Sequence, residues 1–158
     1  MKKICLYCCI VGTFAFAEYK VEYNGIEVGK VENFDTLKDS YVKANPTSWL
    51  SKMYLGNRNL IIYDEQFSLS KDETKNKYKK ERSSLIDLLK NIYSGKIKPG
   101  TIKINKDKKI VLKKEGNKYY YEFVRKGKDK VGGFFETKNK ELIQLVENTN
   151  GIVITKVR

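Results

Sequence analysis

Apolar and polar residues alternate in two short runs near the start of the chain, at residues 19–23 and 26–28. A period of two is typical of strands with one buried face, so these runs predict two adjacent strands. Asn24-Gly25 separates the runs, and both residue types tolerate a positive φ angle. The pattern therefore predicts a β-hairpin closed by a two-residue type I′ turn.

That turn also predicts the register of the hairpin. Tyr23 should lie opposite Ile26, and Val21 opposite Val28, with all four side chains on the face that packs on the core. The alternation slips at Gly29, which predicts a bulge or bend in the second strand. We expect this hairpin to form the first edge of a single curled sheet.

Two further strands are predicted before the middle of the chain. A turn at residues 33–38 leads to a short strand at residues 39–44. This strand should end at Asn45-Pro46, because proline removes a donor from the hydrogen-bond ladder. The next strand covers residues 59–67, around a continuous apolar centre.

Residues 47–55 carry apolar side chains at helical spacing, so we expect a short helix there. It contains Trp49, the only tryptophan of the chain. Large aromatic residues are most often packed in the core, and our hypothesis is that this helix lays Trp49 on the core. The alternative is an aromatic side chain that faces a ligand.

The most strongly patterned helix covers residues 71–94. Ser70 and Glu73 match a capping box, and Gly95 provides a stop. The second half of this helix has an apolar stripe and should pack on the sheet, whereas the first half is highly charged. The basic residues of the first half form a candidate partner-contact surface, with a solvated helix end as the alternative: Lys75, Lys77, Lys79, Lys80 and Arg82.

Regular turn signals divide the rest of the chain into six predicted strands. These strands cover residues 101–104, 109–113, 118–125, 131–137, 141–146 and 152–157. Gly132-Gly133 predicts a strong bend, of the kind that curls a sheet toward a barrel. The expected fold class is mainly β (α+β): a curled antiparallel meander, half-barrel or barrel-like sheet, with one central amphipathic helix.

Residues 1–17 have the pattern of a secretory signal peptide. Lys2 and Lys3 precede a short apolar run, and Ala15-Phe16-Ala17 has the small residues that a signal peptidase reads. An uncleaved membrane anchor is the alternative, but the run is short for a hydrocarbon core about 30 Å thick. We expect cleavage after Ala17, a periplasmic location, and a single β-rich domain at residues 18–158.

Cleavage would change the cysteine content and the charge. All three cysteines precede residue 10, so the mature chain would have no disulfide and no thiolate metal site. Loss of Lys2 and Lys3 would lower the net charge from +13 to +11. Export argues against nucleic acid as a partner. The basic residues then form either an ordinary solvated surface or a surface that attracts anionic envelope material such as lipid headgroups.

The usual catalytic residues are missing from the sequence. Without histidine, the chain has no Ser-His-Asp or Cys-His site and no ordinary zinc site. Ser68-Leu69-Ser70-Lys71 matches a Ser-x-x-Lys dyad, but its companion motifs are absent. The adjacent pairs Asp64-Glu65 and Asp72-Glu73 have ordinary explanations on a strand and at a helix start. We therefore expect no catalytic residue, no cofactor and no metal.

An excess of aromatic residues in the predicted meander is the remaining signal. An exposed aromatic face would suit an apolar ligand or a protein interface. The simpler interpretation is that the helix covers this face. With Trp49, the candidate residues are Tyr119, Tyr120, Tyr121, Phe134 and Phe135.

The hairpin also carries a family resemblance. Tyr19-x-Val21-x-Tyr23-x-Gly25-Ile26-x-Val28-Gly29, behind a signal peptide, resembles the opening of an exported bacterial family catalogued as domain of unknown function 3108. Residues 84–89 with Lys98-Pro99-Gly100, and residues 141–157, are similar to later parts of that family. The resemblance implies a β-rich periplasmic domain related to lipoprotein carriers, with no catalytic residues to transfer.

These observations predict a non-enzymatic periplasmic binding or scaffold protein. It would be an accessory component of a cell-envelope assembly, for example a flagellar motor or secretion machinery. Its partners would be envelope proteins or an anionic envelope component. The alternative is a carrier of a lipid or other apolar ligand in the curled sheet. A third hypothesis, cleavage of glycan, would need two converging carboxylates.

Overall fold

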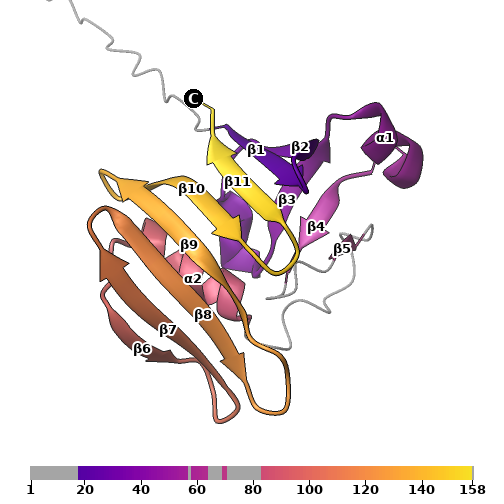
Figure 1. Ribbon diagram of the computed structural model, residues 1–158. Helices are drawn as coiled ribbons and strands as arrows, with labels where there is room; N and C mark the ends of the chain where they lie inside the picture. Colours follow the sequence, from indigo (N-terminus) through magenta and orange to yellow (C-terminus); the bar gives the residue numbers. More distant parts are fainter. Residues whose placement is uncertain (1–17, 57, 64–68, 71–82, 158) are drawn as a thin grey trace, which may run out of the picture.

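A computed structural model describes residues 18–56, 58–63, 69–70 and 83–157. Within these ranges, eleven antiparallel strands form one sheet in the order β5-β4-β3-β2-β1-β11-β10-β9-β8-β7-β6 (Figure 1). The end strands of this order do not pair with each other, so the sheet is curled but open. The predicted mainly β fold with an antiparallel meander is confirmed.

Eleven strands make up this sheet. They are β1 (Tyr19–Tyr23), β2 (Ile26–Val31), β3 (Val42–Pro46), β4 (Leu60–Ile62), β5 (Leu69–Ser70), β6 (Gly100–Lys103), β7 (Lys108–Glu115), β8 (Lys118–Arg125), β9 (Val131–Lys138), β10 (Glu141–Glu147) and β11 (Ile152–Lys156). The six strands predicted after residue 96 correspond to β6 through β11, with ends that differ by at most two residues. Turn residues locate these strands well because each hairpin is local.

The position predicted for the opening hairpin is wrong. β1 pairs with β2 on one side and with β11 on the other, so the hairpin lies in the middle of the sheet. Tyr19 is opposite Lys156 and Tyr23 is opposite Ile152. This pairing joins the two ends of the described chain, which no local sequence pattern encodes. β1 thereby links the two halves of the sheet.

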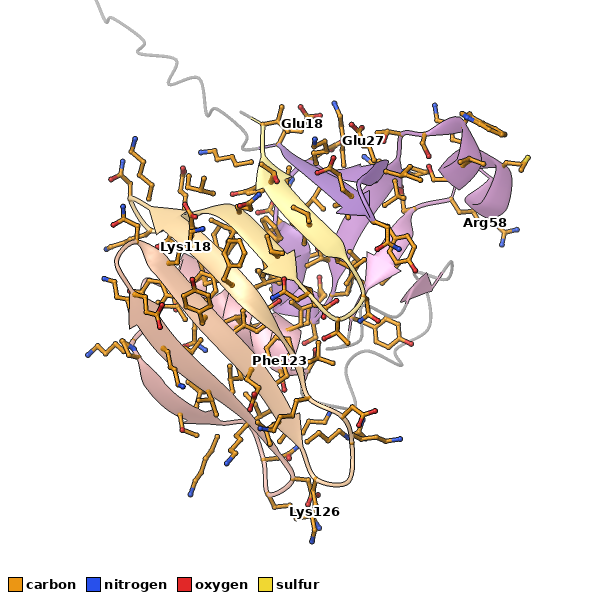
Figure 2. All side chains as sticks on the ribbon, viewed as in Figure 1. Glu18, Glu27, Arg58, Lys118, Phe123 and Lys126 are labelled. Atoms are coloured by element: carbon orange, nitrogen blue, oxygen red, sulfur yellow. The ribbon has the colours of Figure 1, made fainter. Side chains whose placement is uncertain are left out.

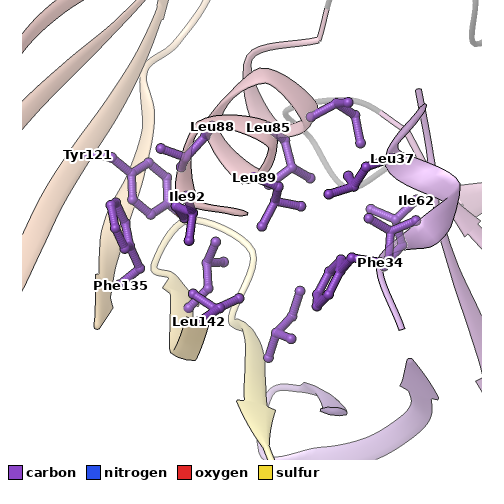
Figure 3. Packing of buried hydrophobic residues seen from close by; sticks show 14 of the residues in the cluster. Phe34, Leu37, Ile62, Leu85, Leu88, Leu89, Ile92, Tyr121, Phe135 and Leu142 are labelled. Carbon is purple, nitrogen blue, oxygen red and sulfur yellow. The ribbon is translucent and has the colours of Figure 1, made fainter. Parts of the chain in front are cut away.

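The amphipathic helix α2 (Ser84–Tyr93) forms the core with the concave face of the sheet. Ser83 caps it, and the Ser83 hydroxyl accepts a hydrogen bond from the Ile86 amide. Figure 3 shows Leu88 and Ile92 directed toward Tyr121 and Phe135, whereas Leu85 and Leu89 face Leu37 and Ile62. The fully buried helix side chains are Leu85, Ile86, Leu88, Leu89 and Ile92. Each such burial contributes about 1.5 to 3 kcal/mol, so α2 holds the curled sheet together.

The predicted start of this helix is wrong. Ser70 does not cap α2, because it ends β5, where it is paired with Ile61. The serine that does cap the helix is Ser83. The rest of the predicted first half, residues 71–82, lies outside the described residues. Ser83 lacks the glutamate three residues later that completes a capping box, so the sequence pattern favoured Ser70, whereas the observed helix starts where the apolar stripe packs on the sheet.

Three predicted elements before the middle of the chain are either confirmed or shifted along the sequence. The turn at residues 33–38 corresponds to a short 3-10 helix, η1 (Asp35–Asp39), whose Leu37 is buried. The strand after it begins at Val42 rather than at residue 39. The short helix α1 (Trp49–Leu55) is confirmed, and Ser48 caps it.

The hairpin register is partly confirmed. Asn24 and Gly25 have positive φ angles of 49° and 79°, as a type I′ turn requires, and Tyr23 lies opposite Ile26. Val21 pairs with Gly29 instead of Val28, because β2 contains the expected bulge. A Cβ atom on Gly29 would lie 2.9 Å from the Asn45 carbonyl oxygen, so a glycine lets β3 approach there.

A tyrosine pair joins α2 to β1 inside the core. The Tyr93 hydroxyl donates a hydrogen bond to the Tyr19 hydroxyl at 2.7 Å, and the Phe34 ring lies against both rings. Burial is the main cause that raises the pKa of each phenol, and for Tyr93 the hydrogen bond to Tyr19 raises it further. Both hydroxyls therefore stay neutral at physiological pH and serve as a polar link within the core.

Candidate functional site

The structure separates the predicted aromatic residues into three groups. Tyr121 and Phe135 are buried beneath α2, and Tyr119 is partly buried with its ring stacked on Phe135 at 5.0 Å. These three residues are core, as the simpler interpretation expected. Tyr120 and Phe134 are on the opposite, outer face of the sheet. Trp49 is on neither face, because it belongs to α1.

The outer face of the sheet carries a short apolar row. Tyr120 pairs with Phe134, Phe134 with Val146, and Val146 with Val153. Tyr120 is 39% exposed, and the other three are partly buried. Lys118 pairs with Glu136 at 3.4 Å beside this row, and its ammonium lies 4.5 Å from the Phe134 ring centre. Charged neighbours thus cover much of the row, as is usual for a solvated sheet face.

Most of the exposed apolar side chains belong instead to two neighbouring elements, the hairpin turn and α1, which contacts β2. Five of the seven exposed large apolar residues among the described residues lie there, and we call this group the apolar end. Its members, with their exposed fractions, are Tyr23 (49%), Ile26 (53%), Trp49 (70%), Leu50 (39%) and Met53 (67%). The prediction that Trp49, Tyr23 and Ile26 pack on the core is therefore wrong. The hairpin tip and α1 extend beyond the side chains that surround α2.

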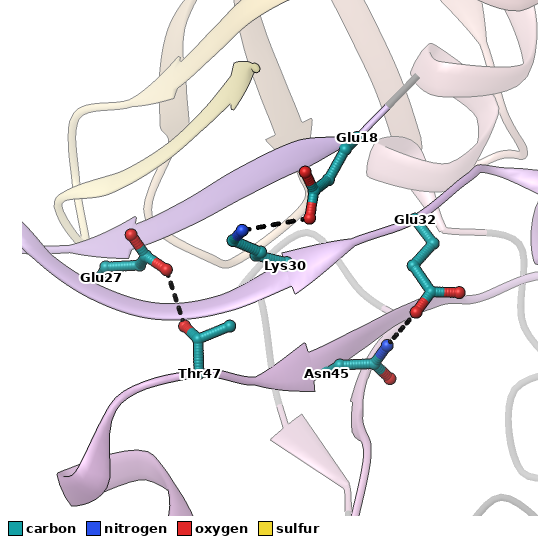
Figure 4. A network of polar contacts seen from close by, with 6 residues as sticks. All are labelled: Glu18, Glu27, Lys30, Glu32, Asn45 and Thr47. Carbon is teal, nitrogen blue, oxygen red and sulfur yellow. Dashed lines mark hydrogen bonds and ion pairs between the residues drawn. The ribbon is translucent and has the colours of Figure 1, made fainter. Parts of the chain in front are cut away.

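Polar contacts fix α1 on the sheet beside the hairpin. The Thr47 hydroxyl, just before α1, donates a hydrogen bond to the Glu27 carboxylate of β2 at 2.8 Å (Figure 4). The Ser48 hydroxyl accepts from the Ser51 amide at 3.0 Å and caps the helix. α1 also contacts β2 and β3 directly. The exposed apolar side chains are therefore presented by an anchored helix and not by a loose loop.

The same polar network continues along β2. Lys30 pairs with Glu18 at 3.1 Å, and the Asn45 amide donates to the Glu32 carboxylate at 2.8 Å (Figure 4). With Glu27 bound to Thr47, the acidic side chains of this region already have partners. They hold strands together and do not converge on one point, so they offer no pair for acid-base catalysis.

The sequence around α1 is basic. No acidic residue occurs between Asp39 and Asp64, whereas Lys43, Lys52 and Arg58 lie in that interval. Lys52 and Arg58 are exposed, and Figure 2 shows Arg58 just below α1. α1 therefore combines apolar and positively charged side chains, a combination suited to an anionic or amphipathic partner.

The other predicted contact surface falls on residues that the structure does not describe. Lys75, Lys77, Lys79, Lys80 and Arg82 lie outside the described residues, as do Asp64-Glu65 and Asp72-Glu73. Among the residues that are described, no three acidic, cysteine or histidine side chains come close enough to hold a metal ion. No helix in the same ranges is long and apolar enough to cross a bilayer.

A polar cleft of about 240 Å³ lies between β2, η1 and β3. It is lined by Glu32, Asn33, Thr36, Lys43 and Asn45. The Thr36 hydroxyl oxygen is buried there without a hydrogen-bond partner. Specific ligand pockets usually measure about 300 to 1,000 Å³ and are mostly apolar, so this small polar cleft does not suit a lipid.

Sequence reasoning missed the buried carboxylate of Glu147, which is fully inaccessible to solvent. Its two oxygens accept hydrogen bonds from the amides of Thr149 and Asn150, at 2.6 and 2.7 Å. It also raises the pKa of Tyr121, in addition to the larger effect of burial. The available signal was a glutamate directly before a predicted turn, which is typical of a side chain that caps a loop. Glu147 is thus structural.

The chain matches none of the protein-family models, curated proteins or solved structures with which it was compared. The resemblance of its hairpin to the exported family therefore stays a prediction.

The position of Trp49 gives a direct test of the apolar end. Because Trp49 is the only tryptophan and is 70% exposed, we expect acrylamide to quench its fluorescence in the native protein almost as well as in urea. Trp49→Phe should leave the unfolding free energy within about 0.5 kcal/mol of the wild type. Emission that resists quenching would show that Trp49 is buried, and would contradict the exposed helix.

Proposed function

We propose that this chain is a non-enzymatic periplasmic binding or scaffold protein that attaches to another envelope component as an accessory part of a larger assembly. The observation that carries the proposal is the apolar end. Apolar side chains that are two-thirds exposed, as Trp49 and Met53 are, favour a site that is covered by a partner. The signal-peptide pattern of residues 1–17 supports the periplasmic location.

The carrier alternative receives less support from the core. A carrier needs an apolar space inside the curled sheet, whereas α2 occupies the concave face with Leu88, Leu89 and Ile92 fully buried. The side chains that would have lined such a space, Tyr121 and Phe135, are also packed there. Binding through an outer surface is the function that the described residues support better.

Fractionation of native envelopes tests the proposal. We expect the wild-type chain to sediment with envelope material, and Met53→Glu to release most of it into the soluble fraction, because a charge would replace a buried apolar contact. Tyr120→Ser is the matched control, since it changes an exposed aromatic residue far from α1 and should sediment like the wild type. Recovery of the wild type only as a free monomer would refute the proposal.

A further inference from the structure

We infer that the partner of the apolar end is an anionic lipid surface, into which α1 inserts Trp49 and Met53. This inference rests on the proposed function, because it names the envelope component that the chain attaches to. The inferred partner is a membrane surface and not a protein pocket. Three features of the described residues favour the membrane.

The first feature is shape. α1 projects from the body of the molecule at the hairpin end (Figure 1). Among the α1 side chains that the structure describes, Trp49 and Met53 are the most exposed apolar ones, at 70% and 67%. A protein partner would need a matching cavity for such a convex group, whereas the fluid interface of a bilayer accommodates it without a preformed pocket.

The second feature is the choice of side chains. Tryptophan and tyrosine are enriched where a bilayer meets water, because they combine an apolar ring with a polar group. Trp49 on α1 and Tyr23 at the hairpin tip provide such rings, and Leu50, Met53 and Ile26 provide purely apolar groups. A short helix of this kind lies in the interface with its apolar side chains in the outer acyl region.

The third feature is charge. Lys52 lies between Leu50 and Met53 in the sequence of α1, Arg58 follows the helix, and the chain has no acidic residue between Asp39 and Asp64. On the neighbouring strands, Glu22 of β1 forms an ion pair with Lys20 at 3.0 Å, whereas Glu27 of β2 keeps its negative charge while it accepts a hydrogen bond from Thr47. With residues 1–17 removed, the net charge of +11 adds a long-range attraction to anionic headgroups. Contact between α1 and such a membrane is therefore electrostatically favourable.

Vesicle binding tests this inference, and Trp49 serves as the probe. The protein is taken as recovered from expressing cells, with its amino terminus established by mass spectrometry. It is mixed with vesicles of phosphatidylglycerol and phosphatidylcholine in equal parts, or of phosphatidylcholine alone. We expect a blue shift of Trp49 emission and protection from acrylamide with the anionic vesicles. Lys52→Glu should weaken binding to them by about fivefold or more.

Matched variants separate insertion through α1 from general attraction of a basic protein. Leu50→Glu/Met53→Glu should lower partitioning in a sedimentation assay at least tenfold, on the order expected for loss of a few buried methylene groups. Tyr120→Ser should bind as the wild type does. If the double variant does not fold, the shift of Trp49 emission in the wild type with anionic vesicles still tests the inference by itself.

The results distinguish this inference from the proposed function. Unshifted Trp49 emission with anionic vesicles would overturn the inference, and so would equal binding of wild type and double variant. If native envelopes still retain the wild type and release Met53→Glu, the proposed function stands and the partner is a protein. If envelopes also fail to retain the wild type, both are refuted.

Discussion

Gly133→Ala is expected to destabilise the fold by about 3 kcal/mol or more, because the strand β10 occupies the space that a side chain would need. A Cβ atom on Gly133 would lie 1.8 Å from the carbonyl oxygen of Val146. The same oxygen accepts a hydrogen bond from the Tyr121 hydroxyl at 3.1 Å. Tyr121 pairs with Gly133 in the sheet, so its side chain reaches across the glycine to the next strand. Urea unfolding, followed by far-ultraviolet circular dichroism, measures the effect.

Two variants test whether the steric clash with β10 causes the stability lost in Gly133→Ala. Gly116→Ala changes a glycine in the β7–β8 turn that has open space around its Cβ position and a φ angle of 59°. It should lower the free energy of unfolding by only about 1 to 2 kcal/mol, because alanine is strained at a left-handed φ angle. Tyr121→Phe removes the hydrogen bond alone and should cost about 1 kcal/mol. A Gly133→Ala protein as stable as Gly116→Ala would contradict the close approach of β9 and β10.

Removal of the Glu147 carboxylate is expected to cost about 2 to 4 kcal/mol, because two charge-assisted hydrogen bonds are lost in a buried site. Glu147→Ala would leave the amides of Thr149 and Asn150 without their acceptor. These amides belong to the turn that joins β10 to β11, so the pairing of β11 with β1 should loosen first. Hydrogen exchange of the β11 amides and the free energy of unfolding both report this effect.

The control for Glu147 lies on the same strand. Glu141 begins β10, is exposed, and pairs with Lys156, whose pKa it raises chiefly through their hydrogen bond. Glu141→Gln should change the unfolding free energy by less than about 1 kcal/mol, since an exposed ion pair contributes little. Glu147→Gln should lie between this control and Glu147→Ala, because one acceptor oxygen remains. Equal stability of the Glu141 and Glu147 variants would mean that Glu147 does not hold the turn.

The sequence alone determined the local elements of this protein. Alternation and turn residues predicted β6 through β11 nearly to their ends, and the apolar stripe predicted the buried face of α2. Asn24-Gly25 predicted the hairpin turn. Gly132-Gly133 predicted a bend, and the structure shows that neighbouring strands approach closely at both glycines. These features are local, because each depends on side-chain period or on backbone angles within a few residues.

Only the tertiary structure decided which apolar residues are buried and where the strands meet. The period of two around Tyr23 is the same whether the hairpin tip lies over the core or extends beyond it. The helical spacing around Trp49 likewise does not indicate whether its side chain is buried. β1 became central because β11, from the other end of the chain, pairs with it. The candidate site depends on that long-range arrangement. It consists of apolar residues that lie outside the core and are therefore exposed.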